Sequence, residues 1–264
     1  MKKLTLSICL ILCLGATKFL AEDRLEVGIE YDKKLGQFVD LNLSFTDSDG
    51  SIKKLKDIIK KPTVLSLVYY HCPGICSPLL TNLGKVIDQA QVEPGKDYQV
   101  LTISFDPKED APLAAKWKNN YLKSLKRPVK SEDWSFMVGD SLNIAKITDQ
   151  VGFRYKSDGK DDYIHSGALI VLGTDGKIDR YLLGTDYLPF DFKMAVYETA
   201  KGIAAPPISR MLAYCYSYDP NGRTYVFNFT KVAGTIIFVG AGVLLLTLIL
   251  KGRSKNSNNG GLNV

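Results

Sequence analysis

The feature that most constrains this chain is an apolar strand that runs directly into two cysteines and then into a helix. Residues 63–70 read TVLSLVYY, β-branched and apolar throughout, as expected of a strand covered on both faces. The segment HCPGIC follows at once, and SPLLTNLGKVIDQAQ continues with helical periodicity. We expect Ser77 to cap this helix beside Pro78. The stretch predicts a strand–helix unit with Cys72 and Cys76 at its junction.

The rest of the chain body keeps alternating between strand and helix patterns. YQVLTISF and WSFMVG predict strands, and APLAAKWKNNYLKSL, SLNIAKITDQVGF and DFKMAVYETAKGIA predict helices. GALIVLGTDGKIDRYLLG indicates a hairpin about an Asp-Gly turn, and residues 27–52 indicate an N-terminal hairpin broken by DSDG. Strands alternating with helices, closed by a hairpin and a last helix, predict an α/β sandwich with a mixed sheet.

Both ends of the chain carry apolar segments. Residues 1–21 begin with two lysines and continue with an apolar run, the pattern of a secretory signal. Residues 232–250 contain no charge and are long enough to cross a bilayer. Basic residues without any acid follow that run, so the positive-inside rule leaves the tail in the cytoplasm and the main body outside.

The formal net charge of +6 does not indicate a nucleic-acid partner. Six of the 34 basic residues lie in residues 1–21 and 251–264, and neither segment holds an acid. Residues 22–250 therefore carry 28 basic and 28 acidic side chains. The excess of basic residues therefore belongs to the targeting and membrane-orientation segments, and it does not indicate a surface that binds a polyanion.

Three interpretations of the cysteine pair stay open on the residues alone. A structural disulfide would close a very small loop, and such a loop stabilises a fold least. A thiol–disulfide oxidoreductase suits the strand-to-helix position, although its usual motif places two residues between the cysteines and this one places three. A metal site is the third interpretation, because two thiolates select Cu(I) and imidazole suits copper in either oxidation state.

Two histidines are the candidates for a third metal ligand. His71 adjoins Cys72 at the end of a strand, so we expect its side chain to point away from that sulfur and to be partly buried. His165, in DDYIHSGALIVL, lies just before a strand that could neighbour residues 63–70. From spacing alone, His165 is either a ligand or an ordinary hydrogen-bonded histidine.

Taken together, these motifs resemble the SCO/SenC family. The resemblance rests on VYY-x-C-P-x-x-C, on S-F-D-P at residues 104–107, and on a downstream histidine before T-D-G-K-I; it covers roughly residues 45–203. RYLLGTDYLPFDFKMAVYETAKG and CYSYDPNGRTYVFNFTKVAG resemble a bacterial branch whose domain precedes a C-terminal membrane helix. The family's fold is thioredoxin-like, which implies a three-layer sandwich with a mixed central sheet and, here, a C-terminal transmembrane helix.

The resemblance also implies Cys72, Cys76 and His165 as copper ligands, with Asp106 in support. Asp162, just upstream of the histidine, is a second candidate for a supporting acid. Many members carry an acid just before the ligand histidine, where this chain has Ile164. Asp161 lies upstream beside the second supporting acid. The sequence therefore leaves open which group orients the imidazole.

The family's role implies a membrane-tethered chaperone that delivers copper, as Cu(I) or Cu(II), to the dinuclear copper centre of cytochrome c oxidase subunit II, or keeps the cysteines of that centre reduced. An upstream copper donor or thiol reductant would be a second partner. The expected location is the bacterial inner membrane, single-pass, with the main domain on the periplasmic side. The alternative is a thioredoxin-like thiol–disulfide oxidoreductase acting on periplasmic cysteines, so whether the protein is an enzyme stays open.

These expectations divide the chain into six segments. A double proline at 206–207 marks the end of the domain, and Cys215 beyond it is expected to be a free or buried thiol. The segments are a signal peptide (1–21), an N-terminal extension with a hairpin (22–45), a thioredoxin-like domain (46–205), a juxtamembrane segment (206–231), a transmembrane helix (232–250) and a cytoplasmic tail (251–264).

Overall fold

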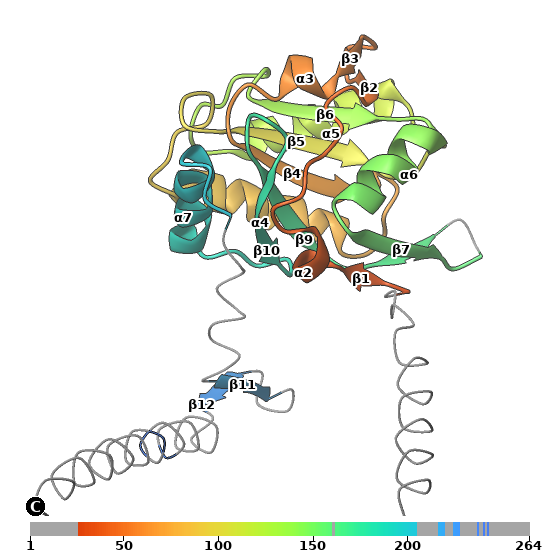
Figure 1. Ribbon diagram of the computed structural model, residues 1–264. Coiled ribbons are helices and arrows are strands. Elements are labelled where there is room, and N and C mark those ends of the chain that lie inside the picture. The colour runs from red at the N-terminus through yellow and green to blue at the C-terminus, as the bar shows by residue number, and fades with distance from the viewer. Residues whose placement is uncertain are drawn as a thin grey trace, which may run out of the picture.

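The computed structural model describes residues 26–159 and 162–204, the backbone of a short hairpin, and three single positions further on (Figure 1). The hairpin pairs β11 (Tyr216–Asp219) with β12 (Thr224–Phe227). The predicted signal, Cys215 and nearly all of the predicted membrane segment lie outside the described residues. Within the described part of the chain, no helix is both long enough and apolar enough to cross a membrane.

A seven-stranded mixed sheet forms the centre of the domain, in the order β10-β9-β4-β5-β6-β2-β3 (Figure 1). Strands β4, β5 and β6 run parallel, and every other neighbouring pair is antiparallel. The strands are β2 (Ser44–Asp47), β3 (Ile52–Lys54), β4 (Thr63–Val68), β5 (Gln99–Ser104), β6 (Trp134–Val138), β9 (Ala168–Leu172) and β10 (Ile178–Leu183).

Helices cover both faces of this sheet, so the domain has three layers. Helix α4 contacts α5 and α7 on one face, and Figure 1 shows α6 on the opposite face. Right-handed crossovers explain this, because the chain steps one way through α4 and α5 and returns through α6. The predicted thioredoxin-like sandwich with a mixed sheet is confirmed. The helices are α2 (Tyr31–Lys34), α3 (Leu55–Ile58), α4 (Cys76–Gln89), α5 (Ala111–Ser124), α6 (Ser141–Gln150) and α7 (Pro189–Ala200).

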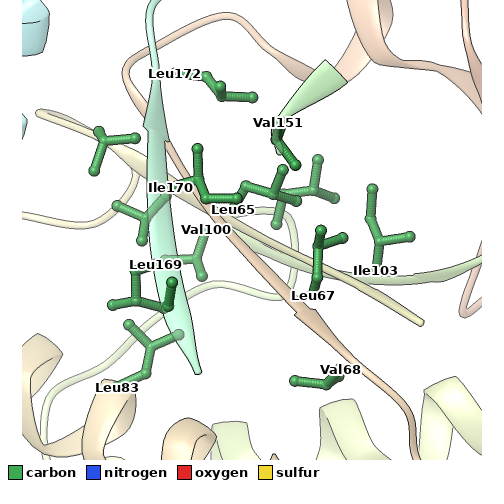
Figure 2. Packing of buried hydrophobic residues seen from close by; sticks show 14 of the residues in the cluster. Leu65, Leu67, Val68, Leu83, Val100, Ile103, Val151, Leu169, Ile170 and Leu172 are labelled. Carbon is green, nitrogen blue, oxygen red and sulfur yellow. The ribbon is translucent and has the colours of Figure 1, made fainter. Parts of the chain in front are cut away.

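The parallel strands are covered on both faces, which is why they read as nearly continuous apolar runs. Every residue of β4 and β6 is buried. Figure 2 shows Val68 and Leu83 on one side of the sheet and Leu67 and Val151 on the other. Leu83 belongs to α4 and Val151 follows α6, so each helical layer packs on its own face. Burying one such side chain, relative to leaving it exposed to water, stabilises the fold by about 1.5–3 kcal/mol.

The predicted N-terminal hairpin is shorter than its sequence pattern. Strands β2 and β3 pair around DSDG, where Gly50 has φ +85°, a conformation that glycine adopts without strain. The residues before them do not join this hairpin: β1 (Gly28–Ile29) pairs with β7 instead. Val39 and Leu43 are buried in the common core. Residues 28–45, which the sequence analysis sets apart as an extension, pack into the main domain.

The sequence patterns do not predict the hairpin of β7 (Phe153–Ser157) and β8 (Tyr163–His165), which with β1 forms a separate three-stranded sheet. The expected helix through Phe153 is wrong at its end. Helix α6 stops at Gln150, and Gly152 turns the chain with φ +66°. The segment FRYKS does alternate apolar and basic residues, the period of a strand, so a signal was present.

The start of α4 also differs from the prediction. The helix begins at Cys76, with Ile75 as its N-cap residue and no side-chain cap, so Ser77 is not the capping residue. Helix α5 begins at Ala111, the first residue of the predicted segment, behind Asp110, whose carboxylate accepts a backbone hydrogen bond. The shift in α4 matters for the site because it places one cysteine inside the first helical turn.

Candidate metal centre

The two cysteines lie at the carboxyl end of β4, where the chain passes into α4. Cys72 is partly exposed in the connecting loop, and the amide of Gly74 donates to its Sγ at 3.3 Å. Cys76 has no exposed surface, because its helical turn packs into the core with Leu79 and Leu80. Both cysteines are free thiols. In α/β sheets, ligands bind outside the carboxyl ends of the parallel strands, so the sulfurs occupy the usual place for a site.

His165 reaches these sulfurs from β8. Its Nε2 lies 3.4 Å from the Sγ of Cys76, a residue 89 positions away in the sequence. The ligand atoms of Cys72, Cys76 and His165 all lie within 4.8 Å of one another. The next strand, β9, pairs with β4 as expected, but His165 ends β8 and does not open β9. Gly167 permits this step, because a Cβ there would lie 3.0 Å from the carbonyl oxygen of Gly184.

One backbone carbonyl and three aromatic rings hold the imidazole of His165. Its Nδ1 lies 3.2 Å from the carbonyl oxygen of Ser166. A carbonyl only accepts, so in the neutral ring Nδ1 carries the hydrogen and Nε2 turns its lone pair toward the sulfurs. The rings of Tyr69, Phe105 and Phe153 have centroids 5.8, 5.0 and 5.7 Å from that of the imidazole. Within the described residues, a backbone carbonyl rather than a carboxylate is therefore the group that orients the ring.

The two thiols differ in acidity. The hydrogen bond from Cys76 lowers the pKa of Cys72, against the opposing effect of burial. The hydrogen bond to Cys72 raises the pKa of Cys76, and burial adds to the rise. Thiolate is both the nucleophile and the metal ligand. Cys72 is therefore the more reactive sulfur, and Cys76 is the buried partner that donates to it.

The two predicted supporting acids reach the site through tyrosines. Tyr69 donates its hydroxyl hydrogen to Asp162 Oδ1, which also accepts the amide of Tyr163 at 3.2 Å. The hydroxyl of Tyr163 lies 3.3 Å from Asp106 Oδ1. Burial raises the pKa of Tyr163 to about 12, so this hydroxyl stays protonated and donates. Ile164, just before the histidine, is exposed. The acids thus tie the β7–β8 hairpin to the ends of β4 and β5.

Glu109 is a site residue that the sequence analysis missed. Its side chain is 1% exposed and accepts hydrogen bonds from the backbone amides of Tyr70 and His71, each at 2.8 Å. The hydroxyl of Ser104 donates to it at 2.5 Å. His71 is mostly exposed rather than partly buried, and its Nδ1 lies 2.9 Å from Glu109 Oε1. The acid follows the Asp-Pro pair in sequence, but only the parallel pairing of β4 with β5 brings it beneath the cysteine loop.

Comparison with known families agrees with this arrangement. The model of the SCO1/SenC family matches residues 32–189, more than half of the chain. The matched range includes the dithiol loop, Glu109 and the β7–β8 hairpin. The chain belongs to the SCO1/SenC family. The predicted family is therefore confirmed.

Individual relatives place the chain within this family. The SCO1 protein homolog of Bacillus subtilis is 24% identical over 152 residues, which cover 56% of this chain and 75% of that protein. A proposed electron transfer protein from Aquifex aeolicus VF5 has a similar structure, with a TM-score of 0.58 and 30% identity over 64% of this chain and 95% of that chain. Arabidopsis thaliana ScoI with copper bound shares the fold, with a TM-score of 0.51 and 18% identity over 64% of this chain and 99% of that chain.

The three ligand atoms suit a small, soft ion. Ligands about 2.2 Å from an ion in a trigonal plane lie about 3.8 Å from one another. A group of atoms within 4.8 Å of one another, with one pair at 3.4 Å, reaches that spacing through small side-chain adjustments. Two sulfurs and one imidazole nitrogen favour copper or zinc over hard cations such as Mg²⁺. Three protein ligands also leave a coordination position for a ligand from another molecule.

Proposed function

We propose that the protein is a copper chaperone that binds the ion through Cys72, Cys76 and His165. The observation that carries the proposal is the convergence of these three ligand atoms within 4.8 Å, although His165 comes from a different sheet. Family membership supports it, and Arabidopsis thaliana ScoI, which shares the fold, has been solved with copper bound. Copper here is cargo, so the site must both hold the ion and release it.

The burial of the ligands supports this double task. Cys76 is buried and His165 lies among aromatic rings, which slows the access of water and competing ligands from that side. Cys72 is partly exposed, so the site is accessible from solution at this sulfur. A ligand from another protein can approach there and displace the protein ligands one at a time. Copper would then pass by ligand exchange, without release into solution.

The destination we propose is the dinuclear copper centre of cytochrome c oxidase subunit II. The support is the family's association with oxidase assembly together with the predicted topology. A signal over residues 1–21 and a membrane helix over residues 232–250 would hold the domain on the periplasmic side of the bacterial inner membrane. A tether in the same membrane as the oxidase would raise the effective concentration of the two partners.

Copper titration of the reduced full-length chain tests the binding proposal. We expect one Cu(I) per chain, competed by a chromogenic Cu(I) chelator, and no such site in a Cys72→Ser/Cys76→Ser double variant. The matched control is Ser77→Ala, a neighbouring hydroxyl change that leaves both sulfurs in place. Stoichiometric binding that survives in the double variant, or the absence of binding to the wild-type chain, would refute the proposal.

A second candidate is a thiol–disulfide reductase, favoured by the unequal thiols. A partly exposed thiolate beside a buried thiol is the arrangement of an attacking and a resolving sulfur. The same sulfurs cannot hold copper while they form a disulfide, so the two functions would alternate at one site. Turnover of a disulfide substrate by a chain that fails to bind copper would establish the reductase in place of the chaperone.

A further inference from the structure

The loop that leads into Cys72 is anchored by one buried carboxylate. Glu109 is 1% exposed, yet it accepts hydrogen bonds from two consecutive backbone amides, those of Tyr70 and His71, and from the hydroxyl of Ser104. A buried carboxylate is costly unless its oxygens are satisfied in this way. Because Ser104 ends β5 and Tyr70 follows β4, Glu109 fixes the two strand ends relative to each other.

The same carboxylate orients an exposed imidazole. Nδ1 of His71 lies 2.9 Å from Glu109 Oε1, while 72% of the His71 side chain is exposed. An ionised carboxylate only accepts hydrogen bonds, so Nδ1 carries the hydrogen and, in the neutral ring, Nε2 carries a lone pair. This lone pair belongs to the outer, exposed part of the ring. His71 is not among the three residues whose ligand atoms lie within 4.8 Å of one another.

A histidine held by a carboxylate through one ring nitrogen is the usual form of a metal-binding histidine. The carboxylate selects the tautomer, limits rotation of the ring and raises the basicity of the free nitrogen. Here that nitrogen belongs to the residue next to Cys72, a proposed copper ligand that is itself partly exposed. The bond to Glu109 satisfies Nδ1 only, and among the described residues no hydrogen bond occupies Nε2, which can bind another group.

We propose that His71, oriented by Glu109, is a transient exchange ligand for copper on the exposed side of the site. This inference rests on the proposed chaperone function. A bond from copper to His71 Nε2 forms while one bond from copper to the donor molecule breaks, and a thiolate of the site then replaces the imidazole. The reverse sequence releases the ion. Each step exchanges one ligand for another, so no electron is transferred and copper keeps its oxidation state.

The test compares two variants of His71 in the full-length chain. His71→Asn keeps an N–H donor at the position of Nδ1, so the bond to Glu109 is retained while Nε2 is lost. His71→Ala removes both. Each chain is loaded with Cu(I), and the release of copper to the chelator bicinchoninate is followed by absorbance in stopped flow. An equilibrium titration with the same chelator gives the affinity.

For His71→Asn we expect release and uptake to be at least about tenfold slower, a change in barrier of about 1.4 kcal/mol, with the equilibrium affinity unchanged. Equal slowing in both directions is what a transient ligand produces. Release at the wild-type rate would overturn the proposal. A fall in equilibrium affinity would also overturn it, because His71 would then be a resident ligand. Failure of the wild-type chain to bind copper would be seen in the titration and concerns the chaperone proposal instead.

Glu109→Gln supplies a second readout that does not depend on copper. Glutamine offers one acceptor oxygen where glutamate offers two, so the orientation of His71 should be lost. Long-range ¹H–¹⁵N correlation spectra of the copper-free chain report which ring nitrogen carries the hydrogen. We expect the Nδ1–H form of His71 to dominate in the wild type and to lose its dominance in Glu109→Gln. Spectra in which the Nε2–H form dominates in the wild type would refute the orientation on which the proposal depends.

Discussion

The two regions that supply the site are held in different ways. The dithiol loop is short and its two sulfurs are four residues apart, so its geometry follows from β4, α4 and the backbone bonds to Glu109. The β7–β8 hairpin is not part of the central sheet, and its last residue, His165, lies 89 positions beyond Cys76 in the sequence. Ring contacts with Tyr69 and Phe105 hold it in place, together with the hydrogen bonds from Tyr69 to Asp162 and from Tyr163 to Asp106.

This difference indicates how the two candidate functions are related. Thiol chemistry needs only the loop, which forms from neighbouring elements. Metal binding needs the hairpin as well, because only the hairpin delivers the imidazole. A disturbance of the hairpin should therefore weaken copper binding first and thiol exchange later. The predictions below test that order.

The largest expected effect comes from Phe105→Ala. Phe105 is completely buried, and its ring contacts both Tyr69 in the loop and His165 in the hairpin. Truncating a buried phenylalanine costs about 3–5 kcal/mol of unfolding free energy. Here it also removes one of the aromatic rings that pack against the imidazole of His165. Urea unfolding would measure the loss. An unfolding free energy within about 1 kcal/mol of the wild type would show that the two regions are not packed through this ring.

Next in size is His165→Ala. Loss of a group that only supports a metal ligand lowers metal affinity about 10–100-fold. Loss of the ligand itself should lower it more, so we expect copper affinity to fall by at least about a hundredfold. The rate of disulfide exchange should be largely retained, because both sulfurs stay in place. Chelator competition and a disulfide reduction assay would measure the two effects in the same preparation. Equal losses in both assays would contradict the separation of the two regions.

A smaller effect is expected from Asp162→Ala, which removes the acceptor for Tyr69 and for the amide of Tyr163. A hydrogen bond to a charged group contributes about 1.5–3 kcal/mol, and part of that is regained from water at this half-exposed position. We expect unfolding free energy to fall by about 1 kcal/mol and copper release to accelerate. Tyr163→Phe, which removes only the 3.3 Å bond to Asp106, is the matched comparison and should change both quantities less.

The smallest effect concerns pH. The pKa of Cys72 lies well below its usual range, first because of the hydrogen bond from Cys76, so the thiolate should persist as the solution becomes acidic. The rate of alkylation by iodoacetamide should then change less than about twofold between pH 6 and pH 8, whereas an unperturbed thiol changes roughly 80-fold. Cys76→Ala removes the thiol donor and should steepen the profile. If the alkylation rate of the wild type depends on pH as that of an ordinary thiol does, the pKa of Cys72 is not lowered and the proposed difference in acidity between the two sulfurs is wrong.

Patterns within single elements predicted most of the central sheet. TVLSLVYY became β4, and GALIVLGTDGKIDRYLLG became the β9–β10 hairpin, because apolar runs and an Asp-Gly turn express local preferences. The β7–β8 hairpin was missed, since the strands are short and half-exposed and the preceding helical period continued into Phe153. Glu109 was missed for a different reason. Its role depends on the side-by-side pairing of β4 with β5, which no local pattern records.

The sequence alone determined that two cysteines would lie at a strand-to-helix junction, because strand and helix preferences act over neighbouring residues. It also determined, through its motifs, the family to which the chain belongs. Only the tertiary structure decided that His165 approaches the sulfurs, that a backbone carbonyl orients its ring, and that Glu109 holds His71 outward. Those contacts join residues far apart in the chain, and their formation depends on how the packed sheet and the aromatic cluster bring the segments together.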